Sequence, residues 1–510
     1  MLIMKWMTAH DGRLVATWIQ SAESGCAGCC EAAIMVKLKW TMDRDGRLAR
    51  TPAQSGETMP AGMQGDREVL WSIFKRAIFL LVWILMVASS LALAQEASTT
   101  VPSDEKSWDV QFQSTVVGQG HPSFPAAYTG SNSLTTGAAV RETVSLDMTG
   151  GARLWHGGEF FGDILMWQGY GLNNALGLAG FPNAEAYRVG KTYPDVYLCR
   201  SYLRQTIGFG GGKVAADDGL GGKRDDRNLT LTVGHLSAKD IFDANAYSND
   251  GRSQFMNWAL VANGAWDYPA DTLGFTNGLA AELNTRAWSG RVGIFQVSKV
   301  ANGIRMDWNL THAWSSVAEV ERRYTLRGHA GAVRLLAFDT RSHMGSYQET
   351  IDSPNLGGNI TLTAAYRYKY GFGINLEQEI RNDLGVFARV GWNDGKNQTY
   401  EFTDVDRTAT AGLSLRGSRW GRPQDTVGLA AVANGISGVH REYLAAGGLG
   451  ITVGDGALDY RAERMVEAYY NWKVSRHFHL TPDYQFAQNP AYNHVRGPVD
   501  IFALRLHSEF

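Results

Sequence analysis

Two pairs of charged side chains, each pair four residues apart, are well suited to bind a polar ligand. Arg200 and Arg204 form one pair, and Glu282 and Arg286 form the other. Residues i and i+4 of a β-strand lie on the same face, so each pair should point its charges in one direction. The planar fork of a guanidinium can meet two hydroxyl groups or one carboxylate. Alternatively, these charges only pair with one another across a wall and hold a cavity open.

A segment downstream adds more charge between the two pairs. Ala238–Arg252 carries two carboxylates that we single out, Asp240 and Asp243, together with Asn249 and Asp250. The segment is long enough to fold inward and narrow a central opening. The alternative is an external loop that binds ions or lipid head groups.

Motifs of common enzyme classes are incomplete in this chain. Gly208–Lys213 is rich in glycine, but position 207 is not glycine and Val214 follows the lysine, so the phosphate-binding Gly-x4-Gly-Lys pattern is missing. Gly412–Arg416 lacks the second glycine of a nucleophile elbow. His477 and His479 share a face, but a place on a wet wall explains them better than a metal site. We therefore expect neither an enzyme nor a metal protein.

The C-terminal segment indicates which elements position these groups. Its side chains alternate in character, with Phe502, Leu504, Leu506 and Phe510 on one face and Ala503, Arg505, His507 and Glu509 on the other. A strand of this kind lies between an apolar and an aqueous environment. A terminal strand that ends in an aromatic residue is typical of outer-membrane β-barrels, although Ser508 departs from that pattern. A half-buried strand of a soluble sandwich is the alternative.

The same alternation recurs along the chain, with charged residues on the polar face. It is clearest in Gly278–Trp288, Val317–Leu326, Phe372–Ile380 and Thr408–Arg416. Short connections such as Asn382-Asp383 separate some segments, and long ones such as Phe209–Asn228 and Ala238–Arg252 separate others. Residues 107–510 are therefore predicted to form an all-β fold, a transmembrane antiparallel β-barrel of about 16 strands closed by the C-terminal strand. Such a barrel encloses an aqueous channel.

An export signal is predicted at residues 75–94. Lys75-Arg76 precede an unbroken apolar run, Ala77–Ala88, and the small-residue site Ala92-Leu93-Ala94 follows. This order marks a cleaved signal peptide, with Gln95 as the first mature residue and residues 95–106 as a polar lead-in. The run is too short for a membrane-spanning helix.

Residues 1–74 stand in front of this signal and show no periodicity. We interpret them as a misassigned start or a non-structured extension, with Met59 or Met63 as initiators; a cytoplasmic domain is the alternative. They carry three of the four cysteines, Cys26, Cys29 and Cys30, without the second pair that a zinc site needs.

Composition fits a large sheet better than a helical or disordered chain. There are 58 glycines, 11% aromatic residues and only 13 prolines. The net charge of −2 gives no electrostatic reason to expect nucleic acid as a partner. Cys199 is the one cysteine after the signal, so no internal disulfide is expected.

Three stretches resemble the carbohydrate-selective porins of Gram-negative outer membranes, the glucose-porin type. The first is Gly180–Gly190 with Cys199–Gln205. The second combines Asp240–Asp243, Gln254–Leu260, which includes Asn257, and Trp266–Tyr268. The third runs from Asp483–Pro490 through Arg496–Val499 to Phe510. Together they span roughly residues 108–510, and the resemblance says nothing of residues 1–74.

The resemblance implies a cell outer-membrane channel of 16 strands for passive diffusion of mono- or small oligosaccharides, without a cofactor. Sugars in transit, outer-membrane lipids, lipopolysaccharide and, through the C-terminal strand, the barrel-assembly machinery are the expected partners. The substrate-binding residues expected in the lumen are Arg200, Arg204, Asp240, Asp243, Asn257, Glu282 and Arg286. Three other functions remain open: a general small-solute porin, a barrel-borne enzyme and a secreted sugar-binding β protein.

Overall fold

The computed structural model describes residues 105–185, 190–216, 219–401 and 404–510, together with four short strands near the N-terminus. In the N-terminal unit, residues 1–74, the strands form two antiparallel pairs, β1 (Leu2–Thr8) with β2 (Leu14–Gln20) and β3 (Trp40–Met42) with β4 (Leu48–Arg50). The predicted signal peptide lies outside the described residues, so its cleavage stays a prediction.

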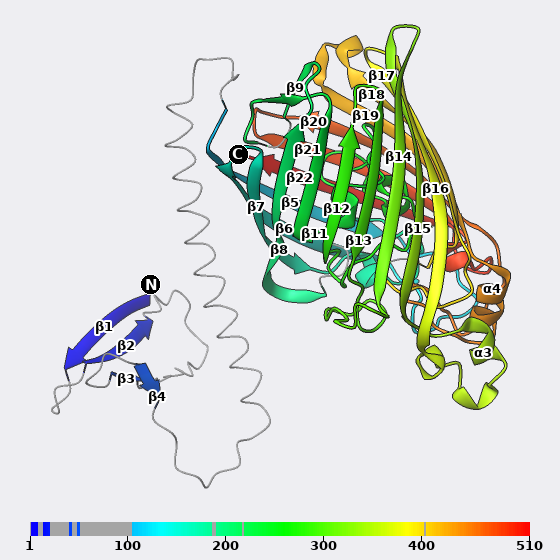
Figure 1. Ribbon diagram of the computed structural model, residues 1–510. Coiled ribbons are helices and arrows are strands. Elements are labelled where there is room, and N and C mark those ends of the chain that lie inside the picture. Colours follow the sequence, from blue (N-terminus) through cyan, green and yellow to red (C-terminus); the bar gives the residue numbers. More distant parts are fainter. Residues whose placement is uncertain are drawn as a thin grey trace. The chain divides into compact units, whose positions relative to one another are not determined.

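The second unit contains a closed antiparallel barrel of sixteen strands, which confirms the predicted fold class (Figure 1). The strands of its first half are β5 (Trp108–His121), β6 (Ala139–Trp155), β7 (Gly158–Gly169), β8 (Lys191–Gly208), β11 (Asn228–Leu236), β12 (Thr276–Asn284), β13 (Trp288–Phe295) and β14 (Trp314–Leu326). Those of its second half are β15 (His329–Met344), β16 (Ala365–Arg381), β17 (Leu384–Asn393), β18 (Arg407–Gly417), β19 (Arg422–Gly435), β20 (Glu463–Lys473), β21 (Phe478–Gln488) and β22 (Val499–Glu509). As predicted, the C-terminal strand closes the barrel, because β22 pairs with β5 from Phe502 opposite Gly120 to Glu509 opposite Gln113.

The two ends of the barrel differ in their connections. At one end, the turn end, the connections are mostly short, such as 156–157, 327–328 and 382–383. This end also holds the start of β5 and the C-terminus. At the other end, the loop end, the connections are long and carry the short helices α3 (Tyr347–Ile351) and α4 (Gly438–Ala445) (Figure 1). Outer-membrane barrels show this asymmetry between short turns and long loops.

One long connection lies at the turn end, contrary to the simple alternation of short turns and long loops. The chain between β8 and β11, residues 209–227, contains the small hairpin of β9 (Lys213–Ala215) and β10 (Lys223–Asp225). Its Leu220 is fully buried and its backbone oxygen accepts a hydrogen bond from the nitrogen of Lys106. This connection therefore covers part of the turn end instead of the loop end.

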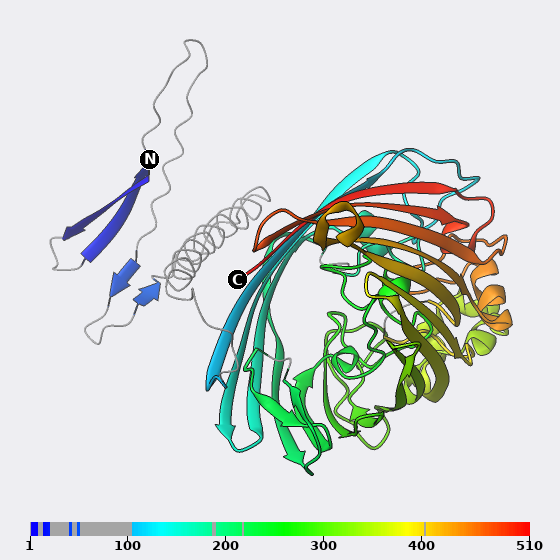
Figure 2. The same cartoon turned by 90° about the horizontal axis from the view of Figure 1, so that it is seen from above.

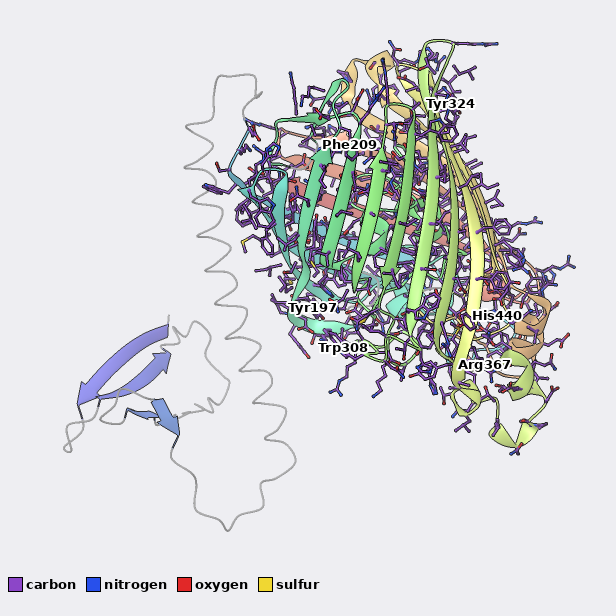
Figure 3. The ribbon with its side chains drawn as sticks, viewed as in Figure 1. Tyr197, Phe209, Trp308, Tyr324, Arg367 and His440 are labelled. Atoms are coloured by element: carbon purple, nitrogen blue, oxygen red, sulfur yellow. The ribbon has the colours of Figure 1, made fainter. Side chains whose placement is uncertain are left out.

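The outer surface of the barrel is apolar and the inner one polar. On β22, Phe502, Leu504 and Leu506 are 57%, 52% and 43% exposed, whereas Arg505 is fully buried on the inner side. Exposed aromatic residues gather near both strand ends: Trp108, Trp155, Phe209, Trp288, Trp472 and Phe478 at the turn end, and Tyr193, Trp308, Tyr366 and Tyr368 at the loop end. Figure 3 labels Phe209 near the turn end and Trp308 near the loop end. An apolar band between two aromatic girdles is what a membrane-spanning barrel requires.

In the described part of the chain, helices are few and short. Besides α3 and α4, one helix, α2 (Trp258–Val261), lies in the connection between β11 and β12. The remaining helical turns are η1 (Leu172–Ala175), η2 (Ala238–Asp240), η3 (Pro354–Leu356), η4 (Ile360–Thr363), η5 (Ser418–Trp420) and η6 (Pro490–Tyr492). Within the described residues, no helix has the length and apolar character needed to cross a membrane.

Candidate functional site: a charged lumen

The connection between β11 and β12, residues 237–275, folds into the barrel and is called the inner loop. Figure 2 looks along the barrel and shows green segments of this part of the chain inside the ring of strands. Phe242, Phe255 and Trp266 of the loop are almost completely buried. Phe255 packs against Phe387 and Tyr469 of the wall, with ring centroids 5.5 and 4.9 Å away. An apolar core inside the barrel thus fixes the inner loop to strands β17 and β20.

Carboxylates of the wall hold the backbone of the inner loop. Glu319 of β14 accepts a hydrogen bond from the nitrogen of Asp243 at 2.8 Å, and Glu377 of β16 accepts one from Ala246 at 2.7 Å. Glu467 of β20 accepts bonds from two consecutive loop nitrogens, including that of Asn257 at 2.9 Å. Buried backbone nitrogens need a hydrogen-bond acceptor, and these side-chain oxygens supply one to the inner loop.

The path of the inner loop narrows the lumen. Asp240, at its start, contacts β8, and Ala246 contacts β16, which lies six strands away from β8 around the ring of sixteen. Arg252 then contacts β6, which lies two strands from β8 on the other side. Because one loop reaches walls on both sides within this short stretch, it crosses the lumen and reduces the open cross-section.

Arg200 lies where the inner loop meets β8. Its Nη1 donates to Asp163 Oδ2 at 2.6 Å, and its Nε and Nη2 donate to the two carboxylate oxygens of Asp240 at 2.7 and 2.8 Å. The guanidinium carbon also lies 5.2 Å from the ring centre of Phe275. The Arg200 and Asp240 side chains are 29% and 32% exposed, so this pair faces solvent in the lumen.

Arg204 lies on the same inner face of β8, as the spacing predicted. Its Nε and Nη2 donate to Glu159 Oε2 at 3.0 and 2.7 Å. The guanidinium stands 4.5 Å above the ring of Phe161, which in turn stacks on Tyr202 at 5.3 Å. Each of the two arginines therefore combines a carboxylate partner with an aromatic ring.

A second arginine bridge ties the inner loop to β6. Arg252 Nη1 lies 2.5 Å from Asp147 Oδ2, and its Nε donates to Glu185 Oε2 at 2.7 Å. Asp147 is also within electrostatic range of Asp163 and Arg200. We call the six side chains that meet here the charged cluster: Arg200, Arg252, Asp147, Asp163, Glu185 and Asp240.

Two of the predicted binding residues serve as internal supports. Asp243 is 2% exposed and pairs with buried Arg389, with Nε 3.1 Å from its Oδ1, while its Oδ2 accepts from the nitrogen of Asn263 at 2.8 Å. Asn257 is fully buried; its Oδ1 caps α2 through the nitrogen of Ala259, and its Nδ2 donates to Gly180 O at 2.9 Å. The polar groups of both side chains are used in contacts within the inner loop and between it and the rest of the barrel.

The predicted pair Glu282 and Arg286 does not share a strand face. Glu282 lies on the inner side of β12 and accepts a bond from Arg291 Nε at 3.0 Å, and Arg291 also bridges to Glu319 and Glu321 at 2.7 and 2.8 Å. Arg286 instead lies in the turn after β12, because that strand ends at Asn284. Its side chain is exposed at the turn end, whereas β12 begins at the loop end.

Sequence reasoning missed the two wall carboxylates of the charged cluster. Asp147 lies on β6 and Asp163 on β7, and both alternate with apolar residues in their strands. The alternation of their strands could have predicted that both side chains face inward. Their meeting with Arg252 depends on the path of the inner loop, for which the sequence holds no comparable pattern.

These features define the class of the protein: a membrane-spanning β-barrel channel with a charged, narrowed lumen, of the outer-membrane porin type. A family model described as carbohydrate-selective porin, OprB family, matches residues 131–510. The chain therefore belongs to this family, whose barrels are outer-membrane proteins, and the resemblance found in the sequence is confirmed.

Individual relatives are distant in sequence. Porin AaxA of Chlamydia abortus is 22% identical over 278 residues, which are 54% of this chain and 53% of that protein. The chain thus matches about half the length of this curated relative. The high-pH structure of Pseudomonas putida OprB has a TM-score of 0.60 at 17% identity, covering 79% of this chain and 94% of that one. At this identity the structural likeness supports the fold.

Proposed function

We propose that the protein is a passive channel for neutral mono- or small oligosaccharides and that the charged cluster is its selective part. The observation that carries the proposal is a pair of partly exposed guanidinium groups, each stacked on an aromatic ring, on the inner face of β8 beside the inner loop. Arg200 lies over Phe275, and Arg204 lies over Phe161. The hydroxyl groups of a sugar can meet the partly exposed guanidinium groups, while the buried rings of Phe161 and Phe275 hold the two arginines in place.

The paired state of the charges suits rapid passage. Asp163 and Asp240 hold Arg200, so a hydroxyl group can exchange with water at the edge of a fixed ion pair. A solute must bind well enough to enter and weakly enough to leave. A bound sugar therefore needs no conformational change and no energy source, and a family of channels rather than enzymes supports the proposal that no reaction takes place.

The outer-membrane surroundings complete the proposal. Because outer-membrane barrels have short periplasmic turns and longer external loops, the loop end would face the outside and the turn end the periplasm. Outer-membrane lipid would surround the apolar band, with lipopolysaccharide near the loop end. The C-terminal strand that ends at Phe510 would be the segment recognised by the barrel-assembly machinery.

Reconstitution in a planar bilayer tests the function. The current through the Arg200→Ala/Arg204→Ala channel should increase, because two bulky side chains leave the lumen. Block by added glucose or maltose should weaken about tenfold, since hydrogen bonds to charged donors contribute roughly 1.5–3 kcal/mol. Arg419→Ala, which removes an exposed arginine of a turn, serves as the control.

The alternative functions predict different experimental results. A general small-solute porin would show altered conductance in the double variant, while sugar block kept its concentration dependence. A secreted sugar-binding protein would form no channels and would not show heat-dependent migration on gels after detergent extraction. An enzyme would consume the added sugar or ester, and its product would accumulate with time.

A further inference from the structure

A second polar cavity lies in the lumen at the turn end, away from the charged cluster. It has a volume of about 510 Å³, within the range of small-molecule sites, roughly 300–1,000 Å³. Its charged and aromatic lining comes from the inner loop, the turn after β12 and strands β14 to β16: Tyr247, Arg286, Glu321, Arg323, Tyr324, Arg334 and Glu377. We propose that this cavity is a second sugar subsite, which takes one pyranose ring of a neutral sugar.

Tyr247 offers the aromatic surface of the subsite. Its ring packs closely against β17 at Gly385, where an added Cβ would stand 2.0 Å from the ring. A glycine there lets the ring lie against the wall, and the residue also lines the cavity. An aromatic face held in place in this way can receive the CH side of a pyranose ring.

Two polar groups of the subsite have no partner among the described residues. These are the guanidinium of Arg286 and the hydroxyl of Tyr247; within that part of the chain neither makes a hydrogen bond. Burial and the neighbouring Glu379 and Glu377 raise the pKa of Tyr247, so its hydroxyl stays a donor at neutral pH. Unused donors at the rim of a cavity can be met by hydroxyl groups of a solute.

Fixed neighbours keep these groups in position. Arg323 Nη1 donates to Ser289 Oγ at 3.0 Å and its Nη2 to Trp288 O at 3.1 Å, which braces the turn that carries Arg286. Glu377 pairs with Arg334 at 3.1 Å and accepts from the nitrogen of Ala246 beside Tyr247. Its carboxylate has acceptor capacity left, since two oxygens offer about four lone-pair sites.

The subsite would make the channel asymmetric. A sugar would meet the charged cluster and the turn-end cavity in sequence, with different groups at each. This inference rests on the proposed function, because a subsite for sugars has a role only in a channel that sugars enter.

Glucose block of the reconstituted channel, measured with the sugar on each side of the bilayer in turn, tests the subsite. Tyr247→Leu and Arg286→Ala should weaken block about three- to tenfold, chiefly with glucose on the turn-end side, since each removes one contact of about 0.5–1.5 kcal/mol. Tyr247→Phe keeps the ring, so its block by glucose should weaken less than that of Tyr247→Leu. Arg322→Ala is the matched control, because Arg322 lies on the outer face, 4.8 Å from the ring of Trp288.

Each other outcome overturns the inference in a distinct way. If glucose blocks the Tyr247→Leu and Arg286→Ala channels as strongly as the unchanged channel, but blocks Arg200→Ala more weakly, sugars bind only at the charged cluster. If phosphate blocks at the turn end and glucose does not, the cavity is an anion site. If the unchanged channel shows no sugar block at all, both the proposed function and the subsite fail.

Discussion

Arg389 and Asp243 form an ion pair inside the barrel, with Nε and Oδ1 3.1 Å apart and both side chains at most 3% exposed. Arg389 also donates to the backbone oxygens of Leu260 and Ser248, both at 2.7 Å. One guanidinium on β17 thus holds three points of the inner loop. The width of the lumen depends on this contact, because the loop it holds crosses the lumen.

Replacing Arg389 with Leu should release the inner loop while the barrel stays closed. Removing one partner of a buried ion pair costs roughly 3–5 kcal/mol. Here the lost stability should be that of the inner loop in its position against the wall. Single-channel recordings should show larger and noisier currents than the unchanged protein.

Arg419→Leu provides the comparison, since it breaks the exposed pair with Asp383 and should leave the current unchanged. Exposed pairs contribute at most about 1 kcal/mol. If the Arg389→Leu channel gave the same current and the same low noise as the unchanged channel, the apolar core alone would hold the inner loop in place.

Leu504→Arg should impair insertion of the barrel. Leu504 is 52% exposed on the outer face of β22, and a cation on the lipid face costs about 2–4 kcal/mol near the middle of the bilayer. The yield of heat-modifiable barrel in the outer membrane measures the effect.

Arg505→Leu should insert more readily than Leu504→Arg, because Arg505 faces the lumen. Its Nη1 donates to Gly251 O and Gln254 O of the inner loop at 2.7 and 2.8 Å, so the substitution leaves two loop carbonyls without this donor. The expected defect therefore lies in channel noise, not in barrel yield. Equal barrel yields for the two variants would contradict the facing of β22.

The strands could be predicted from sequence because one physical rule governs each of them. Side chains alternate between lipid and water, so Leu504 and Arg505 were placed correctly from their neighbours alone. Arg200 and Arg204 were likewise placed on one inner face. Arg286 was placed wrongly because β12 ends at Asn284 and the alternation of a strand does not continue into a turn.

The inner loop could not be predicted in the same way. Asp243 and Asn257 carry the polar groups expected of a binding site, yet both are buried supports. What decides their role is contact with residues more than a hundred positions away, such as Arg389 and Gln485. No local spacing records such contacts, whereas the length of Ala238–Arg252 did indicate that this segment folds inward.

The N-terminus of the mature protein is predicted at Gln95. The basic pair Lys75-Arg76, the apolar run and Ala92-Leu93-Ala94 together predict cleavage after residue 94. N-terminal sequencing of the protein purified from outer membranes should therefore begin at or near Gln95. A membrane-embedded form that still contains Cys26 would contradict this prediction.

Lys239 should make the ion selectivity of the channel depend on pH. It lies in the inner loop beside Asp240, and its Nζ donates to Asn249 Oδ1 at 2.7 Å. Burial, and the nearby positive charge of Arg389, lower the pKa of Lys239 to about 8. Its charge is therefore present below pH 8 and is lost as the pH rises to 9, so cations should be favoured more strongly at the higher pH.

The reversal potential in a potassium chloride gradient, measured at pH 7 and pH 9, checks this expectation. The unchanged channel should shift toward cation selectivity between the two values. Lys239→Met lacks the charge at both pH values, and Lys239→Arg keeps it at both, because a guanidinium does not titrate in this range. Both variants should therefore show a smaller shift than the unchanged channel, with Lys239→Met the more cation-selective of the two at pH 7. A full pH shift in Lys239→Met would assign the effect to another group in the lumen.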